Sequence, residues 1–147
     1  MSPLLVFVAV LIGAGLSVQV GLNSQVRQHL GDPALAALAN FLVGTVALLA
    51  YLLVVRADWP LASTLRAVPP TTWLGGLLGA TYVAAAALLA PRLGSASLLA
   101  LLIAGQLLMS LVLDHYGWIG FQAHAANPWR LLGAVLLVGG VVLIVRN

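Results

Sequence analysis

Five long apolar runs, separated by shorter polar stretches, set the pattern of this sequence. A helix needs roughly 20 apolar residues to cross about 30 Å of hydrocarbon, and the runs are close to that length. They do not alternate residue by residue as the strands of a membrane barrel would. We therefore predict an all-α, polytopic membrane protein. The five transmembrane helices are expected near residues 4–26, 34–55, 73–90, 96–113 and 129–145.

Capping signals between the runs support these boundaries. Asp32 and Asn127 each precede a proline, which is the expected order of N-cap and first helical residue for spans two and five. For the other two starts the candidate caps are Thr71 or Thr72 and Ser95 or Ser97, and Pro91–Gly94 is predicted to be a tight turn. The stretches 57–70 and 114–127 are the two long connections.

Composition excludes a water-soluble domain. The 147 residues are 63% hydrophobic and 6% charged, whereas soluble domains carry about 25% charged residues. We therefore expect one transmembrane domain over residues 1–147, with the first run retained as a helix and not cleaved as a signal peptide. The net charge of +3 comes from scattered arginines, so no nucleic-acid surface is indicated.

The arginines are divided evenly between the two sides of the predicted membrane domain. Orientation follows Lys and Arg in short loops near span ends, and this chain has six arginines and no lysine. Three fall on each side: Arg56, Arg66 and Arg130 against Arg27, Arg92 and Arg146. One interpretation is dual topology with an antiparallel homodimer. The alternative is that six charges tie by chance.

A weak repeat suggests how the spans group. Residues 27–34 and 92–96 share an Arg, a Leu-Gly pair, a capping residue and an Ala, each between an odd and an even span. If this is a true repeat, the fold is two helical hairpins plus a fifth helix. Convergence of tight turns on glycine and a cap is the alternative.

The span interiors carry uncharged polar residues and no charged ones. Such residues either line a cavity or act as hydrogen-bonding contacts between helices. Gln106, Ser110 and Asp114 share one helix face, so Asp114 is a possible coupling residue; a charge facing interfacial water is the alternative. The candidate substrate-binding residues are Gln19, Asn23, Asn40, Tyr82 and Gln106.

Small residues recur at helical spacing in two spans and are predicted to let helices pack closely. They are Gly13, Ser17 and Gly21 in the first span and Gly75, Gly76 and Gly79 in the third. Asp114, His115 and His124 lack the spacing of a metal site. No nucleophile–base pair and no cofactor motif occurs, so we expect neither metal nor cofactor, and no enzyme activity.

Several segments resemble the YdcZ-type inner-membrane exporters of the drug/metabolite transporter superfamily. The segments are Gly21–Arg27, Leu30–Ala34, Asn40–Thr45, Trp73–Val83, Pro91–Gly94, Gly105-Gln106 and Asp114–Gly117. The resemblance implies a multi-pass protein of the bacterial inner membrane that works as a five-helix half-unit. Small multidrug resistance proteins of that superfamily couple protons through a glutamate in span one; this chain has no glutamate, so that mechanism is not carried over.

Together these features predict a secondary transporter of a small polar or weakly cationic molecule. It would work by alternating access in an antiparallel homodimer. A passive pore formed by the same dimer is the alternative, and a membrane scaffold without transport is a third interpretation.

Overall fold

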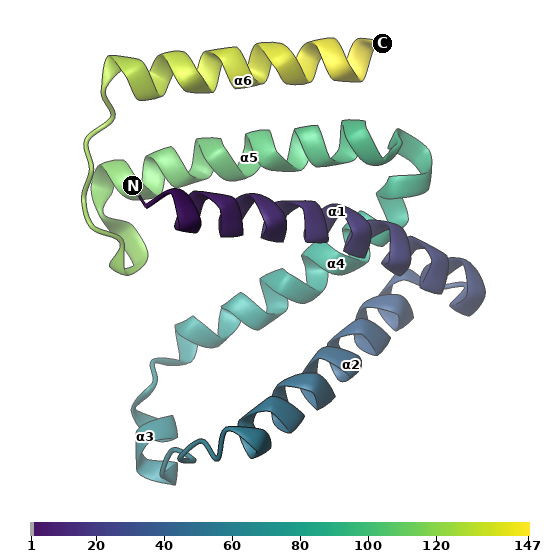
Figure 1. The fold of residues 1–147 in the computed structure, drawn as a ribbon, viewed down its shortest axis with the longest axis vertical. Helices are drawn as coiled ribbons and strands as arrows, with labels where there is room; N and C mark the ends of the chain where they lie inside the picture. The colour runs from purple at the N-terminus through teal and green to yellow at the C-terminus, as the bar shows by residue number, and fades with distance from the viewer. Residues whose placement is uncertain (1) are drawn as a thin grey trace. The chain divides into compact units, whose positions relative to one another are not determined.

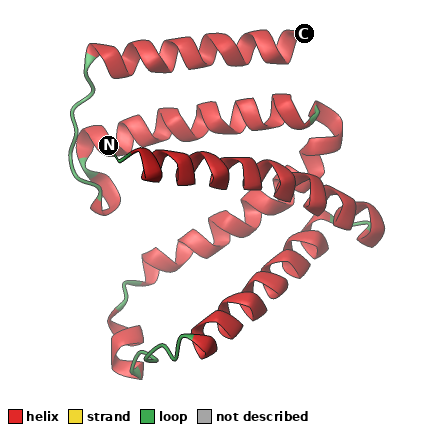
Figure 2. Cartoon of the chain, in the orientation of Figure 1, coloured by secondary structure: helices red, strands yellow, loops and turns green. Residues whose placement is uncertain are grey.

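The computed structural model describes residues 2–147, which fold into helices joined by short loops (Figure 2). No strand occurs within this described part. In chain order the elements are α1 (Pro3–Leu30), α2 (Pro33–Val54), α3 (Ala62–Ala67), the 3₁₀ helix η1 (Pro70–Trp73), α4 (Leu74–Leu93), α5 (Ser95–Tyr116), the 3₁₀ helix η2 (Trp118–Gly120) and α6 (Pro128–Arg146).

Five helical segments are long and apolar enough to cross a membrane, which confirms the prediction of five spans. They are Pro3–Leu30, Pro33–Val54, Pro70–Leu93, Ser95–Tyr116 and Pro128–Arg146. The helix α1 has 28 residues and is therefore about 42 Å long at ~1.5 Å per residue. It exceeds the hydrocarbon thickness, so its last turn, which carries Arg27 and His29, reaches the membrane edge.

The chain groups into two compact units, residues 1–92 and 93–147. In the first unit, α1 and α2 pack together and meet at a turn centred on Gly31 (Figure 1). Gly31 has φ +78°, which favours glycine, and its N–H donates to the Arg27 carbonyl over 2.8 Å. The Asp32 carboxylate accepts from the N–H groups of Ala34 and Leu35 at 2.7 and 3.0 Å. The predicted cap is confirmed.

In the second unit, α5 and α6 pack along each other (Figure 1). The Asn127 side chain caps α6 by accepting from the Arg130 N–H over 2.9 Å, as predicted. Spans four and five therefore form a hairpin, and the hairpin of spans three and four that the repeat suggested stays a prediction. The fifth span is a packed partner of the fourth and not an appended helix. A single membrane domain over the whole chain stays a prediction.

Three local expectations were wrong. Neither Thr71 nor Thr72 caps α4, because η1 leads directly into it and the Thr72 hydroxyl donates to the Pro69 carbonyl. Neither Ser95 nor Ser97 caps α5, because its N-cap is Gly94 at φ +78°. Pro91–Leu93 is the end of α4 and not a turn. A proline is tolerated there since only one backbone hydrogen bond of the last turn is lost.

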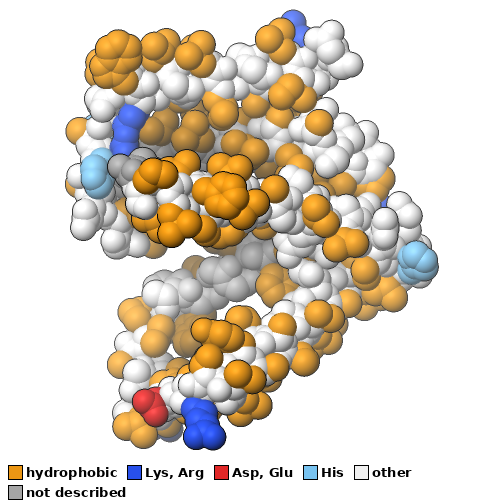
Figure 3. Space-filling model, viewed as in Figure 1, with side chains coloured by type: hydrophobic (Ala, Val, Ile, Leu, Met, Phe, Trp, Pro, Cys, Tyr) orange, Lys and Arg blue, Asp and Glu red, His pale blue; other side chains and the backbone are white. Residues whose placement is uncertain are grey.

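Apolar side chains cover most of the helical surface. On the face in Figure 3 they spread along the helices, and the few charged side chains in view lie near helix ends. Residues 2–16, which include the first half of α1, are all exposed. In water this would be an aggregation surface, but in lipid it is the expected outer face.

Replacing Asp32 with alanine is expected to lower the free energy of unfolding by about 1 kcal/mol, because two N–H groups of α2 lose their acceptor. Thermal unfolding of the detergent-purified chain measures this. Asp58→Ala is the matched control, since within residues 2–147 the Asp58 carboxylate accepts no hydrogen bond. Equal midpoints for the two variants would contradict the capping role.

Candidate functional site

Helix geometry places Gln19 and Gln106 well inside the spans that carry them. Axial positions follow from the helical rise of about 1.5 Å per residue. Gln19 is about 12 Å from Arg27, and Gln106 is about 12 Å from Asp114. Half of a hydrocarbon layer is about 15 Å. These amides are therefore near the bilayer centre, where polar groups usually serve a function or a helix contact.

Asn23 and Ser24 are the buried polar residues among residues 2–147, with exposed fractions of 6% and 8%. Both lie on α1, one turn before Arg27. Burying an amide away from water costs free energy unless it is hydrogen-bonded, so a buried Asn in an apolar span requires an explanation. The sequence had singled out Asn23 but not Ser24. The available signal for Ser24 was a polar side chain next to Asn23 in an apolar span.

The other four predicted residues differ in burial. Gln19, Asn40 and Tyr82 are half-buried, and Gln106 is exposed. Within residues 2–147 no hydrogen bond joins any two of the five candidates. Gln19, Asn23, Asn40 and Tyr82 belong to the first compact unit and Gln106 to the second. Their assembly into one cavity therefore stays a prediction.

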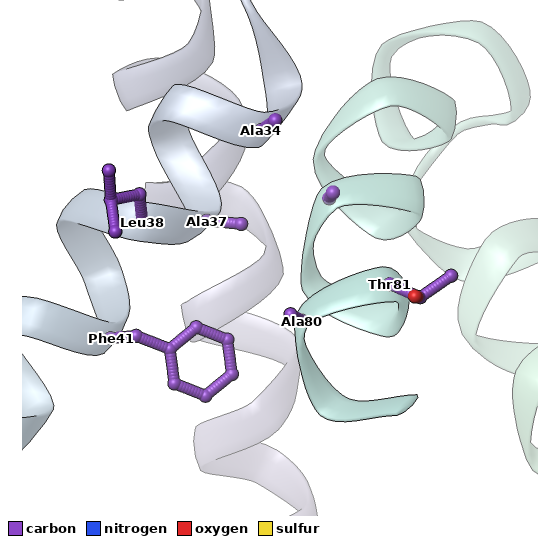
Figure 4. Close-up of a pocket in the computed structure, with 7 residues that line it drawn as sticks. Ala34, Ala37, Leu38, Phe41, Ala80 and Thr81 are labelled. Carbon is purple, nitrogen blue, oxygen red and sulfur yellow. The ribbon is translucent and has the colours of Figure 1, made fainter. Parts of the chain in front are cut away.

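An open apolar groove of about 450 Å³ lies between α2 and α4 (Figure 4). The Phe41 ring extends into the space between the two helices. The hydroxyl of Thr81 donates to the Leu77 carbonyl over 2.9 Å, so its proton is already used within α4. None of the five predicted residues lines this groove. Its lining residues are Ala34, Ala37, Leu38, Phe41, Ala80, Thr81 and Ala84.

The small residues of this groove could have been found in the sequence. Ala34 and Ala37 are three apart and Ala80 and Ala84 are four apart, which places each pair on one helix face. A small-residue face leaves room for close approach or for a ligand. The packing prediction was made from the glycines instead, because glycine is the stronger packing signal in membrane helices.

A second groove, lined by α5 and α6, contains Ser110 and Asp114. The predicted shared face of these two residues is therefore observed, but Gln106 does not line the groove. Asp114 forms an ion pair with Arg130, with 3.3 Å between Oδ2 and Nη1. The sequence did not indicate this partner, because the two residues belong to different spans and are 16 positions apart. His115 and His124 lie nearby and contact backbone groups: His115 Nδ1 accepts from the Ala126 N–H, and the His124 ring bonds the Gln122 carbonyl.

Most of the predicted packing glycines face open space. A Cβ built at Gly13, Gly21, Gly75 or Gly76 meets no atom within 4 Å, whereas one at Gly79 lies 3.5 Å from the Phe41 ring. Ser17 is half-buried and its hydroxyl donates to the Gly13 carbonyl. The packing role of Gly13, Ser17 and Gly21 stays a prediction that concerns a partner outside the chain.

Comparison with known proteins gives a consistent result. Residues 4–143 match the family model described as "Putative inner membrane exporter, YdcZ". The chain is also 33% identical over 140 residues to "Inner membrane protein YdcZ" of Escherichia coli (strain K12), an alignment that covers 92% of this chain and 90% of that protein. No solved structure matches. With its five apolar helices, the chain is a multi-pass inner membrane protein.

Proposed function

This chain belongs to the family described as "Putative inner membrane exporter, YdcZ", and from that premise we propose that it is a secondary transporter of a small polar or weakly cationic molecule. Transport proceeds by alternating access in an antiparallel homodimer. Asn23 binds the substrate, and Gln19, Asn40, Tyr82 and Gln106 complete the cavity. The protein is a transporter and not an enzyme.

The burial of Asn23 is the observation that carries this proposal. Its amide is almost fully covered in a span that has no charged residue in its interior. An amide has two donors and an acceptor, so it recognises a polar solute by hydrogen bonds without a fixed charge. Such recognition suits a substrate that must leave its water shell and must also be released on the other side.

The positions of the arginines support the antiparallel dimer. Arg27, Arg92 and Arg146 lie in the last turns of α1, α4 and α6. These three helix ends fall on one membrane side when five spans alternate in direction. Arg56, Arg66 and Arg130 fall on the other side. With three arginines on each side, neither orientation is favoured, and both orientations enter the membrane.

Two inverted copies make alternating access a natural consequence. In many transporters, inverted-topology repeats surround a central site near the midplane, and exchanging the conformations of the two repeats turns an inward-facing site outward. Here each repeat would be a whole chain. The exposed faces at Gly13 and Gly21 are suited to contact between the two copies, because an added Cβ meets nothing there.

Proteoliposomes loaded with an isotope-labelled bacterial metabolite extract test the proposal. For a carrier we expect protein-dependent exit of a subset of small polar or cationic compounds, which saturates and accelerates when the same unlabelled compound is present outside. Exit is measured by mass spectrometry. Fast ion flux that follows an imposed voltage would indicate the passive pore instead. If no compound shows protein-dependent exit, the result supports the membrane scaffold without transport.

A further inference from the structure

Of the grooves that α5 and α6 line, one has a charged end and an apolar body. Its volume is about 340 Å³. Asp114 and Arg130 form the charged end, and Ser110 lies one turn before Asp114 in α5. The remaining lining residues are Leu107, Leu111, Gly133, Ala134 and Leu137. We call this the α5–α6 groove. A groove with a charged end and an apolar body suits an amphipathic ligand.

The ion pair at the charged end leaves hydrogen-bonding capacity unused. A single contact joins Nη1 of Arg130 to Oδ2 of Asp114 over 3.3 Å, and the same nitrogen lies 3.4 Å from the His124 carbonyl. The two side chains keep 36% and 29% of their exposure. Within residues 2–147, Nη2 of Arg130 and Oδ1 of Asp114 make no hydrogen bond. One positive and one negative group therefore remain accessible side by side.

Aromatic residues place this end of the groove at the membrane–water boundary. Trp129 precedes Arg130 and is 80% exposed, and Tyr116 and Trp118 are stacked with their ring centroids 4.9 Å apart. Tryptophan and tyrosine gather at the level of the lipid headgroups. Arg130 is about 24 Å along α6 from Arg146, less than the hydrocarbon thickness of about 30 Å, so both arginine side chains must extend outward from the helix ends to reach the two interfaces. The accessible charges therefore face the headgroup layer.

We propose that the α5–α6 groove binds phosphatidylethanolamine, with its phosphate on Arg130, its ammonium on Asp114 and one acyl chain along the apolar body. A guanidinium binds phosphate oxygens through paired N–H groups, and a primary ammonium donates to a carboxylate. Phosphatidylglycerol offers the phosphate without a cation and would set its negative charge beside Asp114. Phosphatidylcholine has a quaternary ammonium and no donor. This binding does not depend on the proposed transport activity.

Native mass spectrometry of the full-length detergent-purified chain, titrated with each of the three lipids, tests the proposal. We expect phosphatidylethanolamine to bind at least about tenfold more tightly than phosphatidylglycerol or phosphatidylcholine, because one charge-assisted hydrogen bond is worth a factor of that size. Arg130→Gln should weaken binding of phosphatidylethanolamine by about tenfold. Asp114→Asn should remove the preference over phosphatidylglycerol. Arg146→Gln, at the other end of α6, is the matched control and should bind as the unmodified chain does.

A second pair of variants leaves the ion pair intact. Gly133 lines the groove and Gly139 does not, and an added Cβ meets nothing within 4 Å at either position. Gly133→Leu should therefore fill part of the α5–α6 groove and reduce the binding of phosphatidylethanolamine, whereas Gly139→Leu should not. Equal affinity for the three lipids, or unchanged binding in both Arg130→Gln and Gly133→Leu, would overturn the proposal. A loss in Gly139→Leu equal to that in Gly133→Leu would do so as well.

Discussion

Replacing Gln28 with lysine is expected to change the proposed mixture of two orientations into a population in which one orientation clearly predominates. Gln28 is exposed in the last turn of α1, beside Arg27. The unmodified chain has three arginines on each side. A fourth positive charge at the first turn breaks the balance, and this turn should remain on the cytoplasmic side.

A reporter fused to the C-terminus, active on one membrane face only, measures the two populations. The unmodified chain should give signals on both faces of the membrane. Thr64→Lys is the matched control because Thr64 is exposed on α3, in the connection that faces the other side. It should shift the chain by a similar amount in the opposite direction.

Some outcomes would end the dimer model. If the unmodified chain reports on one face alone, no inverted copy exists to pair with. If both orientations are present but Gln28→Lys and Thr64→Lys leave the ratio unchanged, the arginine balance does not cause them.

Replacing Asn23 with leucine is expected to reduce exchange-stimulated exit from metabolite-loaded liposomes by at least about tenfold. Asn23 is buried, so a substrate bound there lies in surroundings where a lost hydrogen bond costs roughly 1–3 kcal/mol. Leucine has a similar size but no donor or acceptor, so the polar substrate would lose its partner. Asn23→Ser, which keeps a donor and an acceptor, should retain part of the activity.

Thr45→Val is the control for Asn23→Leu. Thr45 also lies within a span, but its hydroxyl donates to the Phe41 carbonyl over 2.7 Å and is therefore occupied by its own helix. We expect normal exchange in this variant. Thermal unfolding in detergent checks that both variants fold. Normal exchange in a folded Asn23→Leu variant would refute the assignment of Asn23 to the binding site.

Local sequence determined the helices and most of their ends. Each apolar run is long enough to cross the membrane, and a chain in lipid must satisfy its backbone hydrogen bonds within a helix. Asp32 and Asn127 cap their helices because a side-chain oxygen next to a proline needs only the following turn to find its N–H partners. The predicted caps were wrong where α5 begins after Gly94 and where η1 leads into α4. No side chain caps the helix at either start, so the backbone conformation alone begins it.

The candidate site was predictable only in part. Asn23 was found because an amide in an apolar run is conspicuous, but its burial, and that of Ser24, depend on which helix face is covered. The α2–α4 groove and its alanines were missed, since alanine is common in every membrane helix.

Tertiary structure alone decided which spans pair and which charges meet. The sequence repeat suggested an appended fifth helix, yet α6 packs along α5. That packing brings Asp114 to within 3.3 Å of Arg130, although 16 positions separate them along the chain. Hydrophobicity acts residue by residue and can be read along the sequence. Helix pairing in lipid depends on the fit of two surfaces and on contacts between distant residues, which no local pattern encodes.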